Sequence, residues 1–287
     1  MYRMKTFLVS IAGLAVAFAL SGCLTETTEK TVYVGGPDTA LLASEGQTLN
    51  LRFYPRFGTD TLKLGRKYLT AGGDSVRFEM ARFYISDIAL VDSTGKSYPL
   101  IGTYLVDVFD SAARALGYAA VDVKALPGTY RGIRYTVGVP FDQNHRDPAL
   151  QASPLGMSSG MFWDWNSGYI FNRVEGKVDS AGTEKALAFH IGGDNHTVPV
   201  NLFGLSSSDS ISVTVVSGHK VAALAKVAHG GVTHLPINVA YDAIFSKGLN
   251  TSAALKPSTN PGERIAMMGA IADRIYLNMQ SMFSLRK

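Results

Sequence analysis

The segment that decides the fold is Thr48-Leu49-Asn50-Leu51-Arg52-Phe53, in which polar and apolar side chains alternate. An alternation with period two places the apolar side chains on one face of an extended strand. The same period recurs along the chain in segments bounded by Gly, Pro, Asn, Asp and Ser. These segments are 76–80, 104–108, 130–137, 169–174, 186–190, 211–215 and 237–241. The pattern predicts a mainly β protein with the architecture of an antiparallel β-sandwich.

Three stretches depart from the strand pattern. The Ala-containing segment 111–116 predicts a short helical turn, and residues 220–228 fit either a helix or a strand. After Pro261-Gly262, apolar residues recur every three or four positions, which predicts an amphipathic C-terminal helix that closes the sandwich. The residues of this stripe are Ile265, Met268, Ile271, Ile275, Met279 and Met282.

The beginning of the chain has the order of a lipoprotein leader. Arg3 and Lys5 precede an apolar run over residues 7–20, and the sequence Ser21-Gly22-Cys23 follows. A basic start, an apolar run too short to span a bilayer and small residues before a cysteine are typical of a cleaved secretory signal. We therefore predict that residues 1–22 are a signal peptide and that Cys23, the single cysteine of the chain, carries the lipid.

The leader also predicts the location and the organisation of the mature protein. Residues 23–46 are rich in Thr, Glu, Gly, Pro and Ser, which is typical of a tether between a lipid and a folded domain. Residues 47–287 then form the β-sandwich domain. Leu24 after the cysteine resembles the sorting pattern for the outer membrane, so we expect a periplasm-facing lipoprotein of the cell envelope.

Composition and charge exclude several classes of protein. The chain has 287 residues, of which 46% are hydrophobic and 17% are charged, so it is neither a disordered, a collagen-like nor a disulfide-stapled protein. Removing Arg3 and Lys5 with the leader lowers the formal net charge from +4 to +2. Because no run of Lys and Arg stands out in the remaining chain, we predict no nucleic-acid partner.

The stretch from residue 138 to 196 differs from the rest, because it holds both tryptophans and three of the six histidines. Its beginning, 138–148, is too polar and too rich in Pro for a strand, and loops of this length are often functional. Trp163 and Trp165 share one face if the chain is extended there. Such a pair fits either a hydrophobic core or, with Tyr169, a platform on which sugars stack.

Two histidines lie on either side of a glycine turn in Phe189-His190-Ile191-Gly192-Gly193-Asp194-Asn195-His196. Imidazoles separated by such a turn can converge on one metal ion, and imidazole suits copper, zinc, nickel and iron. The alternative is a pair of ordinary hydrogen-bonded histidines. The chain has no Gly-x-x-x-x-Gly-Lys loop, and we expect that it is not an enzyme.

The chain contains several short sequence motifs, and their order along the chain is informative. They are Leu51-Arg52-Phe53, Ala81-Arg82-Phe83-Tyr84-Ile85-Ser86-Asp87-Ile88, Pro127-Gly128-Thr129-Tyr130, Gly138-Val139-Pro140 with Asn144-His145-Arg146-Asp147, Met161-Phe162-Trp163-Asp164-Trp165 and Phe189-His190-Ile191-Gly192. In this order the chain resembles the methanobactin-partner-like (MbnP-like) periplasmic proteins, which are often encoded beside a di-haem cytochrome c peroxidase-like protein.

The resemblance implies a β-sandwich that binds copper and whose tryptophan is oxidised to kynurenine by the haem partner. Kynurenine has a free aromatic amine, which can coordinate copper beside imidazole nitrogens. On this resemblance Trp163 or Trp165 is the modified residue. His190 matches the family's Phe-His-x-Gly position and is the first candidate ligand, His145 matches the Asn-His-x-Asp position, and His196 is the third candidate.

Two functions remain open at this point. The first is a lipid-anchored, non-enzymatic copper-binding protein that acts in copper scavenging, storage or delivery. The second is a glycan- or ligand-binding β-sandwich lipoprotein in which Trp163, Trp165 and Tyr169 form a stacking surface. The second function requires exposed rings and no metal.

Overall fold

The computed structural model describes residues 39–163, 168–203, 211–213, 233–246 and 253–286. The predictions for the leader, Cys23, Trp165 and residues 220–228 therefore lie outside the described residues. Residues 36–287 form one compact unit. Among the described residues, no helix has the length and apolar character needed to cross a membrane.

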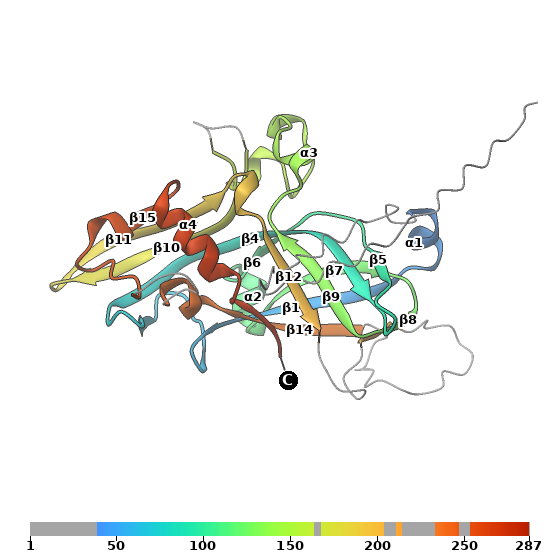
Figure 1. Ribbon diagram of the computed structural model, residues 1–287, viewed down its shortest axis with the longest axis horizontal. Helices are drawn as coiled ribbons and strands as arrows, with labels where there is room; N and C mark the ends of the chain where they lie inside the picture. The colour runs from blue at the N-terminus through green and yellow to red at the C-terminus, as the bar shows by residue number, and fades with distance from the viewer. Residues whose placement is uncertain (1–38, 164–167, 204–210, 214–232, 247–252, 287) are drawn as a thin grey trace, which may run out of the picture. The chain divides into compact units, whose positions relative to one another are not determined.

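The smaller main sheet is built around β1 (Gln47–Phe57), shown in blue in Figure 1. On one side β1 pairs in parallel with β14 (Thr233–Ala240), and on the other it pairs antiparallel with β7 (Ala119–Ala125). β14 in turn pairs antiparallel with β16 (Phe283–Leu285), and the short β2 (Asp60–Thr61) pairs with the end of β1. The first and last strands of the described chain thus belong to the same sheet.

The larger sheet is organised by β4 (Ser75–Val91). The first half of β4 pairs with β10 (Ile170–Ser180), which forms a hairpin with β11 (Thr183–Gly192). The second half pairs with β9 (Gly132–Val137), which pairs with β12 (Val198–Phe203). The short strands are β3 (Lys67–Leu69), β5 (Ser97–Pro99), β6 (Tyr104–Asp107) and β15 (Ile265–Ala266) in this sheet, and β8 (Gly128–Tyr130) with β13 (Ile211–Val213) in a separate ladder.

The main hydrophobic core lies between the two sheets, as the alternating pattern requires. Phe53 of β1 contacts Phe83 of β4 edge-on, with ring centres 5.5 Å apart, and Tyr135 of β9 at 6.2 Å. The predicted mainly β sandwich is confirmed. Its sheets are mixed rather than purely antiparallel, because the pairs β1–β14 and β11–β15 are parallel.

The predicted helical turn at 111–116 is confirmed as α2 (Ser111–Leu116). The Asp110 carboxylate accepts a hydrogen bond from the Ala113 amide at 2.7 Å, which caps the first turn, and Gly117 ends the helix with a φ of 78°. Apart from the C-terminal helix, the other helical segments are short; they are α1 (Thr39–Glu45), α3 (Phe141–Asn144), η1 (Pro148–Leu150), η2 (Met157–Ser159), η3 (Asp194–His196), η4 (Tyr241–Phe245) and η5 (Pro261–Glu263).

The predicted C-terminal helix exists but is shorter than the apolar stripe. It is α4 (Ala270–Met279), and it packs Ile275 and Met279 into the core. The prediction was wrong for Ile265, Met268 and Met282, which lie outside the helix. Ile265 and Met268 are 56% and 65% exposed, whereas Met282 is buried. The reason is that residues 265–266 pair with β11 as the strand β15. Their backbone hydrogen bonds therefore belong to the sheet, and the helix begins only after them.

Candidate metal and modification site

The segment between β9 and β10 packs on the outer face of the larger sheet, away from the main core (Figure 1). It contains α3, η1 and η2, so the loop predicted at 138–148 includes short helical turns. Apolar side chains of this segment form a second hydrophobic cluster with residues of β4 and β10. Its buried members are Tyr84, Val139, Leu155, Met161, Trp163, Tyr169, Ile170 and Phe171.

Trp163 is buried in this second cluster, with only 5% of its surface exposed. The tip of its indole lies against Gly192 at the end of β11. A Cβ atom placed at Gly192 would lie 2.7 Å from Trp163 Cη2 and would also collide with the Tyr169 carbonyl oxygen. A glycine at this position therefore allows the close approach of the indole to the strand.

His190 lies two residues before Gly192 on β11, so both face the same side of the sheet. This buried imidazole lies 2.7 Å through Nε2 from Glu175 Oε1 on the neighbouring strand β10. The same Glu175 oxygen lies 2.7 Å from Nη2 of Arg173, which is directly opposite His190 in the register. The sheet thus holds a row of three polar side chains, Arg173, Glu175 and His190, beside Trp163.

The electrostatics of this row favour a neutral imidazole. Burial lowers the pKa of His190, and the hydrogen bond with Glu175 opposes this effect without cancelling it. Burial by itself raises the pKa of Glu175, but the hydrogen bonds with Arg173 and His190 outweigh it, so this pKa is lowered. Because an ionised carboxylate can only accept, His190 donates its Nε2 proton to Glu175 and keeps the lone pair on Nδ1.

Arginines of the same sheet face hold the segment between β9 and β10, here called the covering segment, in place. Arg173 Nη1 donates to the Gly160 carbonyl oxygen at 2.5 Å, and Arg82 Nη1 donates to the Ser159 carbonyl oxygen at 3.4 Å. Arg82 also pairs with Asp107 at 2.7 Å. These contacts fix the chain just before Trp163 over β4 and β10.

The other two candidate histidines pair with different carboxylates. His145 Nε2 lies 2.9 Å from Asp194 Oδ2, and His196 Nε2 lies 2.8 Å from Asp273 Oδ1. The structure brings both to the region around η3, which follows β11, but it does not join them to His190. Within the described ranges, no three or more His, Cys, Asp and Glu side chains are grouped so that they could hold a metal ion.

Glu175 and Gly192 are the site residues that sequence reasoning missed. Arg173 and Glu175 do alternate with buried residues on β10, which signals a polar outer face. The pairing of Arg173 with His190, however, depends on the register of β10 and β11, and a single sequence does not contain that register.

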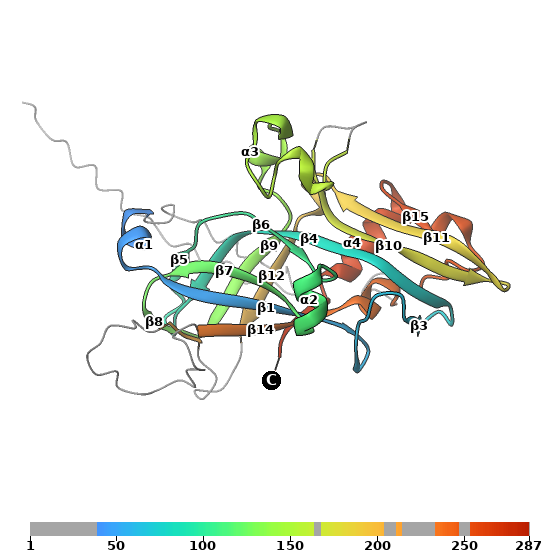
Figure 2. The same cartoon turned by 180° about the vertical axis from the view of Figure 1, so that it is seen from behind.

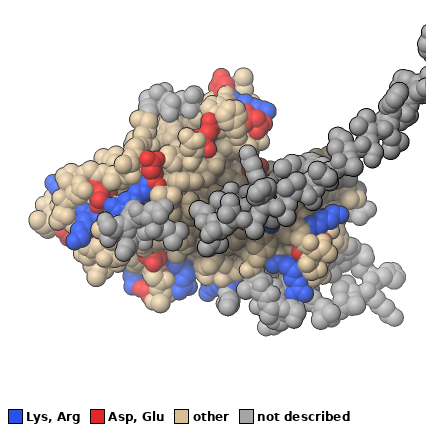
Figure 3. All heavy atoms as spheres, viewed as in Figure 1, with Lys and Arg blue, Asp and Glu red and all other residues tan. Residues whose placement is uncertain are grey.

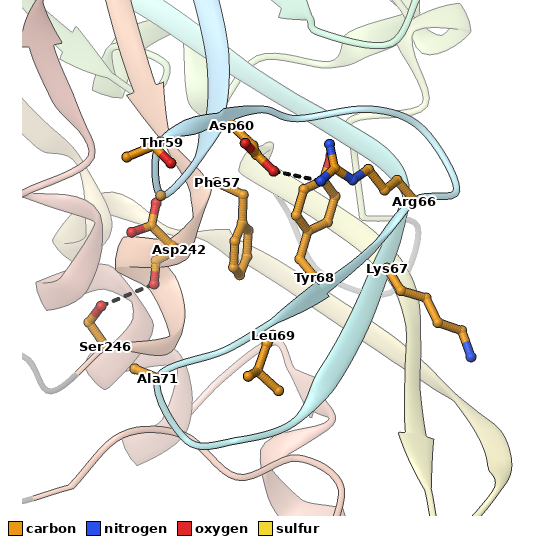
Figure 4. A pocket seen from close by; sticks show the side chains of 11 residues that line it. Phe57, Thr59, Asp60, Arg66, Lys67, Tyr68, Leu69, Ala71, Asp242 and Ser246 are labelled. Carbon is orange, nitrogen blue, oxygen red and sulfur yellow. Dashed lines mark hydrogen bonds and ion pairs between the residues drawn. The ribbon is translucent and has the colours of Figure 1, made fainter.

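A separate cavity of about 400 Å³ lies between the β1–β2 turn, β3 and η4 (Figure 4). Phe57 and Tyr68, which line it, stack on each other with ring centres 4.9 Å apart, and Arg66, another lining residue, pairs with Asp60 at 2.6 Å. None of the described candidate histidines or tryptophans lines this cavity.

Comparison with known proteins places the chain in a family. The family model described as MbnP matches residues 46–265, which include every candidate residue from His145 to His196. The chain belongs to the MbnP family. Among solved structures, MbnP from Methylosinus trichosporium is similar to this MbnP-family chain, with 22% sequence identity and a TM-score of 0.45 over 55% of this chain and 71% of that one. No match is found among curated proteins.

Proposed function

We propose that this MbnP-family protein is a lipid-anchored, copper-binding protein of the cell envelope, and that a di-haem peroxidase-like partner oxidises Trp163 to kynurenine. The observation that supports the proposal is the placement of the Trp163 indole against Gly192, two residues from His190 on the same sheet face. Copper is the cargo, and the protein acts in its scavenging, storage or delivery.

The donor chemistry fits copper. A neutral His190 with its lone pair on Nδ1 is an imidazole donor, and Glu175 fixes the ring through Nε2, as carboxylates commonly do for metal-binding histidines. A kynurenine at position 163 adds an aromatic amine and a ketone oxygen, and nitrogen and oxygen donors suit Cu(II). His145 and His196 are the further candidate ligands, and each would first have to leave its carboxylate, Asp194 or Asp273.

The burial of Trp163 bears on how it is oxidised. With 5% of its surface exposed, the indole offers little area for direct contact with a haem group on another protein. We therefore propose that electrons leave Trp163 through the covering segment to a docked partner. The partner supplies the oxidising power, because haem carries redox chemistry that this chain lacks.

The first experiment is mass spectrometry of the protein isolated from its own host. The haem partner takes electrons from the indole while two oxygen atoms from water enter it, and hydrolysis then releases the formyl group as formate. The net exchange of a carbon for an oxygen means that the peptide that contains residues 161–173 should gain about 4 Da. Fragmentation then separates Trp163 from Trp165. One copper per chain and the mass gain on Trp163 are expected; two unmodified tryptophans and no copper in the same sample would overturn the proposal.

Variants of the histidines then define the ligands. We expect His190→Ala to abolish copper binding. His145→Ala and His196→Ala test the two further candidates, and each should weaken copper binding if its side chain is a ligand. The thermal unfolding midpoint of each variant serves as the control for folding. Copper binding by His190→Ala at the parent affinity would contradict the proposed site.

The stacking-surface function has less support. It requires exposed rings, whereas Trp163 and Tyr169 are both buried. Trp165, its third ring, lies outside the described residues.

A further inference from the structure

The outer face of the smaller sheet carries a cluster of basic and aromatic side chains. On β1, Arg52, Tyr54 and Arg56 alternate with the buried Leu51 and Phe53, so they point away from the core. On the same face, β7 contributes Lys124, Tyr118 directly precedes β7, and Arg286 directly follows β16. We call this cluster the basic–aromatic face: Arg52, Tyr54, Arg56, Tyr118, Lys124 and Arg286.

Two arginines of this face lie over its tyrosine rings. The guanidinium carbon of Arg286 is 4.0 Å from the centre of the Tyr54 ring, and that of Arg52 is 4.9 Å from the centre of the Tyr118 ring. The two rings are 5.0 Å apart. A stacked guanidinium still directs its N–H donors outward in its own plane, and this fork matches phosphate oxygens.

The positive charge of the face is only partly offset by acidic residues. Among the described residues, Arg52, Arg56, Lys124 and Arg286 form no ion pair with a carboxylate. Asp122 is the acidic residue on the outward side of β7, and it accepts a hydrogen bond from Asn50 at 2.6 Å.

The other side of the molecule differs in this respect. Near β10 and β11, at the left of Figure 3, basic and acidic side chains are interspersed. There Arg77 pairs with Glu184 at 2.7 Å and with Glu79 at 2.6 Å. Arg77 is thus paired with carboxylates, unlike the arginines of the basic–aromatic face.

We propose that the basic–aromatic face binds the anionic phosphate headgroups of a lipid membrane. The strands β14, β1 and β7 lie side by side (Figure 2). The cations come from β1, from β7 and from the residue after β16, which pairs with β14, and so form a broad array suited to an extended charged surface. Tyr54 and Tyr118 have apolar rings with polar ends, which suits them to the headgroup layer. The tether also enters the domain at this sheet, where Lys124 donates to Thr48 at 3.3 Å.

Such binding orients the domain. The sheets pack face to face, so the outer face of the larger sheet, with Trp163 and His190, points away from the basic–aromatic face. With the smaller sheet on the lipid, the candidate site faces the aqueous side, where a partner can reach it. This consequence rests on the lipid anchor of the proposed function, whereas the binding itself does not.

The test uses the mature chain from residue 23 onward with Cys23→Ser, so that neither the leader nor a lipid is present, and vesicles of phosphatidylcholine with or without phosphatidylglycerol. We expect binding to the phosphatidylglycerol vesicles that weakens with added salt. In the same chain, Arg52→Gln/Arg56→Gln/Arg286→Gln should bind about 100-fold more weakly, from about fivefold per cation. Lys96→Gln/Lys185→Gln/Lys256→Gln is the matched control, because it removes three exposed charges outside the face and should change binding by less than about threefold.

The outcomes separate the possibilities. Equal binding by the face variant and the parent, or no binding of the parent to phosphatidylglycerol vesicles, overturns the proposal. Should the triple variant fail to fold, Arg286→Gln and Arg56→Gln alone should each weaken binding about fivefold. His190→Ala should leave vesicle binding unchanged, so failure of the copper proposal remains distinguishable.

Discussion

At the scale of single residues, Glu175 connects the two parts of the candidate site, because its carboxylate joins Arg173 to His190. We predict that Glu175→Gln weakens copper binding by about 10- to 100-fold, since the imidazole loses the charge that orients it. We also expect a loss of about 1–3 kcal/mol in the free energy of unfolding, because a partly buried arginine loses its partner. A competition titration and urea unfolding measure the two effects.

The matched control is Glu79→Gln, which removes another carboxylate that pairs with an arginine, here Arg77, on the exposed side of β4. Exposed pairs contribute about 0–1 kcal/mol, so this variant should retain both copper affinity and stability. A Glu175→Gln protein with unchanged copper affinity would remove Glu175 from the site.

Tyr84 predicts a pH dependence of stability. Its buried hydroxyl donates to the Pro154 carbonyl oxygen at 2.9 Å, and burial raises the pKa of Tyr84 to about 12. Unfolded tyrosines have a pKa near 10, so the folded chain holds this proton more tightly. The stabilisation is complete below about pH 10 and is lost as the pH rises towards 12, to a limit of about 3 kcal/mol.

Urea unfolding between pH 8 and about pH 11 measures this loss. Tyr84→Phe lacks the titrating group, so its stability should fall less steeply over the same range, although it begins lower by about 0.5–1.5 kcal/mol for the lost hydrogen bond. Parallel curves for the two proteins would show that Tyr84 does not contribute to the alkaline loss.

At the scale of elements, the end of β11 is where the strand and the covering segment meet. We predict that Gly192→Ala costs about 1–3 kcal/mol, because the added methyl group meets Trp163 and the Tyr169 backbone. In a Trp165→Phe background, the fluorescence of Trp163 should shift to longer wavelength as the indole leaves its buried position. Gly262→Ala is the control, since its Cβ would be 3.4 Å from the nearest atom, and an unshifted spectrum for Gly192→Ala would contradict the packing.

Sequence patterns predicted the strands well and the C-terminal helix only in part. Strands such as β1 and β10 carry their own signal, because the sheet buries every second residue. The apolar residues from Ile265 onward fit both a helix and a short strand. Residues 265–266 become a strand because they pair with the edge of β11, and this pairing cannot be read from their own sequence. The candidate histidines were visible in the sequence, but their carboxylate partners come from other strands and helices.

At the scale of the whole molecule, Phe53 holds the two sheets together through Phe83 and Tyr135. We predict that Phe53→Ala lowers the free energy of unfolding by about 3–5 kcal/mol, and that both sheets still unfold in one transition. Circular dichroism and tryptophan fluorescence should give the same midpoint. Leu69→Ala, at a position that is 72% exposed, should change stability by less than about 0.5 kcal/mol, and a similar loss in both variants would refute the role of Phe53.

The distribution of charge over the surface is also a property of the whole fold. No run of Lys and Arg stands out along the chain, yet the fold gathers Arg52, Lys124 and Arg286 from three distant segments onto one face. Net charge was therefore a poor guide to local charge, because the topology rather than the sequence order decides which residues become neighbours.

The parallel pairing of β1 with β14 has a consequence for how the chain is made. The partners of Leu49 and Phe53 are Thr233 and Ile237, so nearly the whole domain is synthesised between one strand and its neighbour. Such a topology has a high contact order, which slows folding and leaves the first strand with an open edge until the last segments arrive. A ribosome-bound or translocating chain that ends before residue 233 cannot complete the smaller sheet. C-terminal truncations that remove β14 should therefore expose β1 to aggregation.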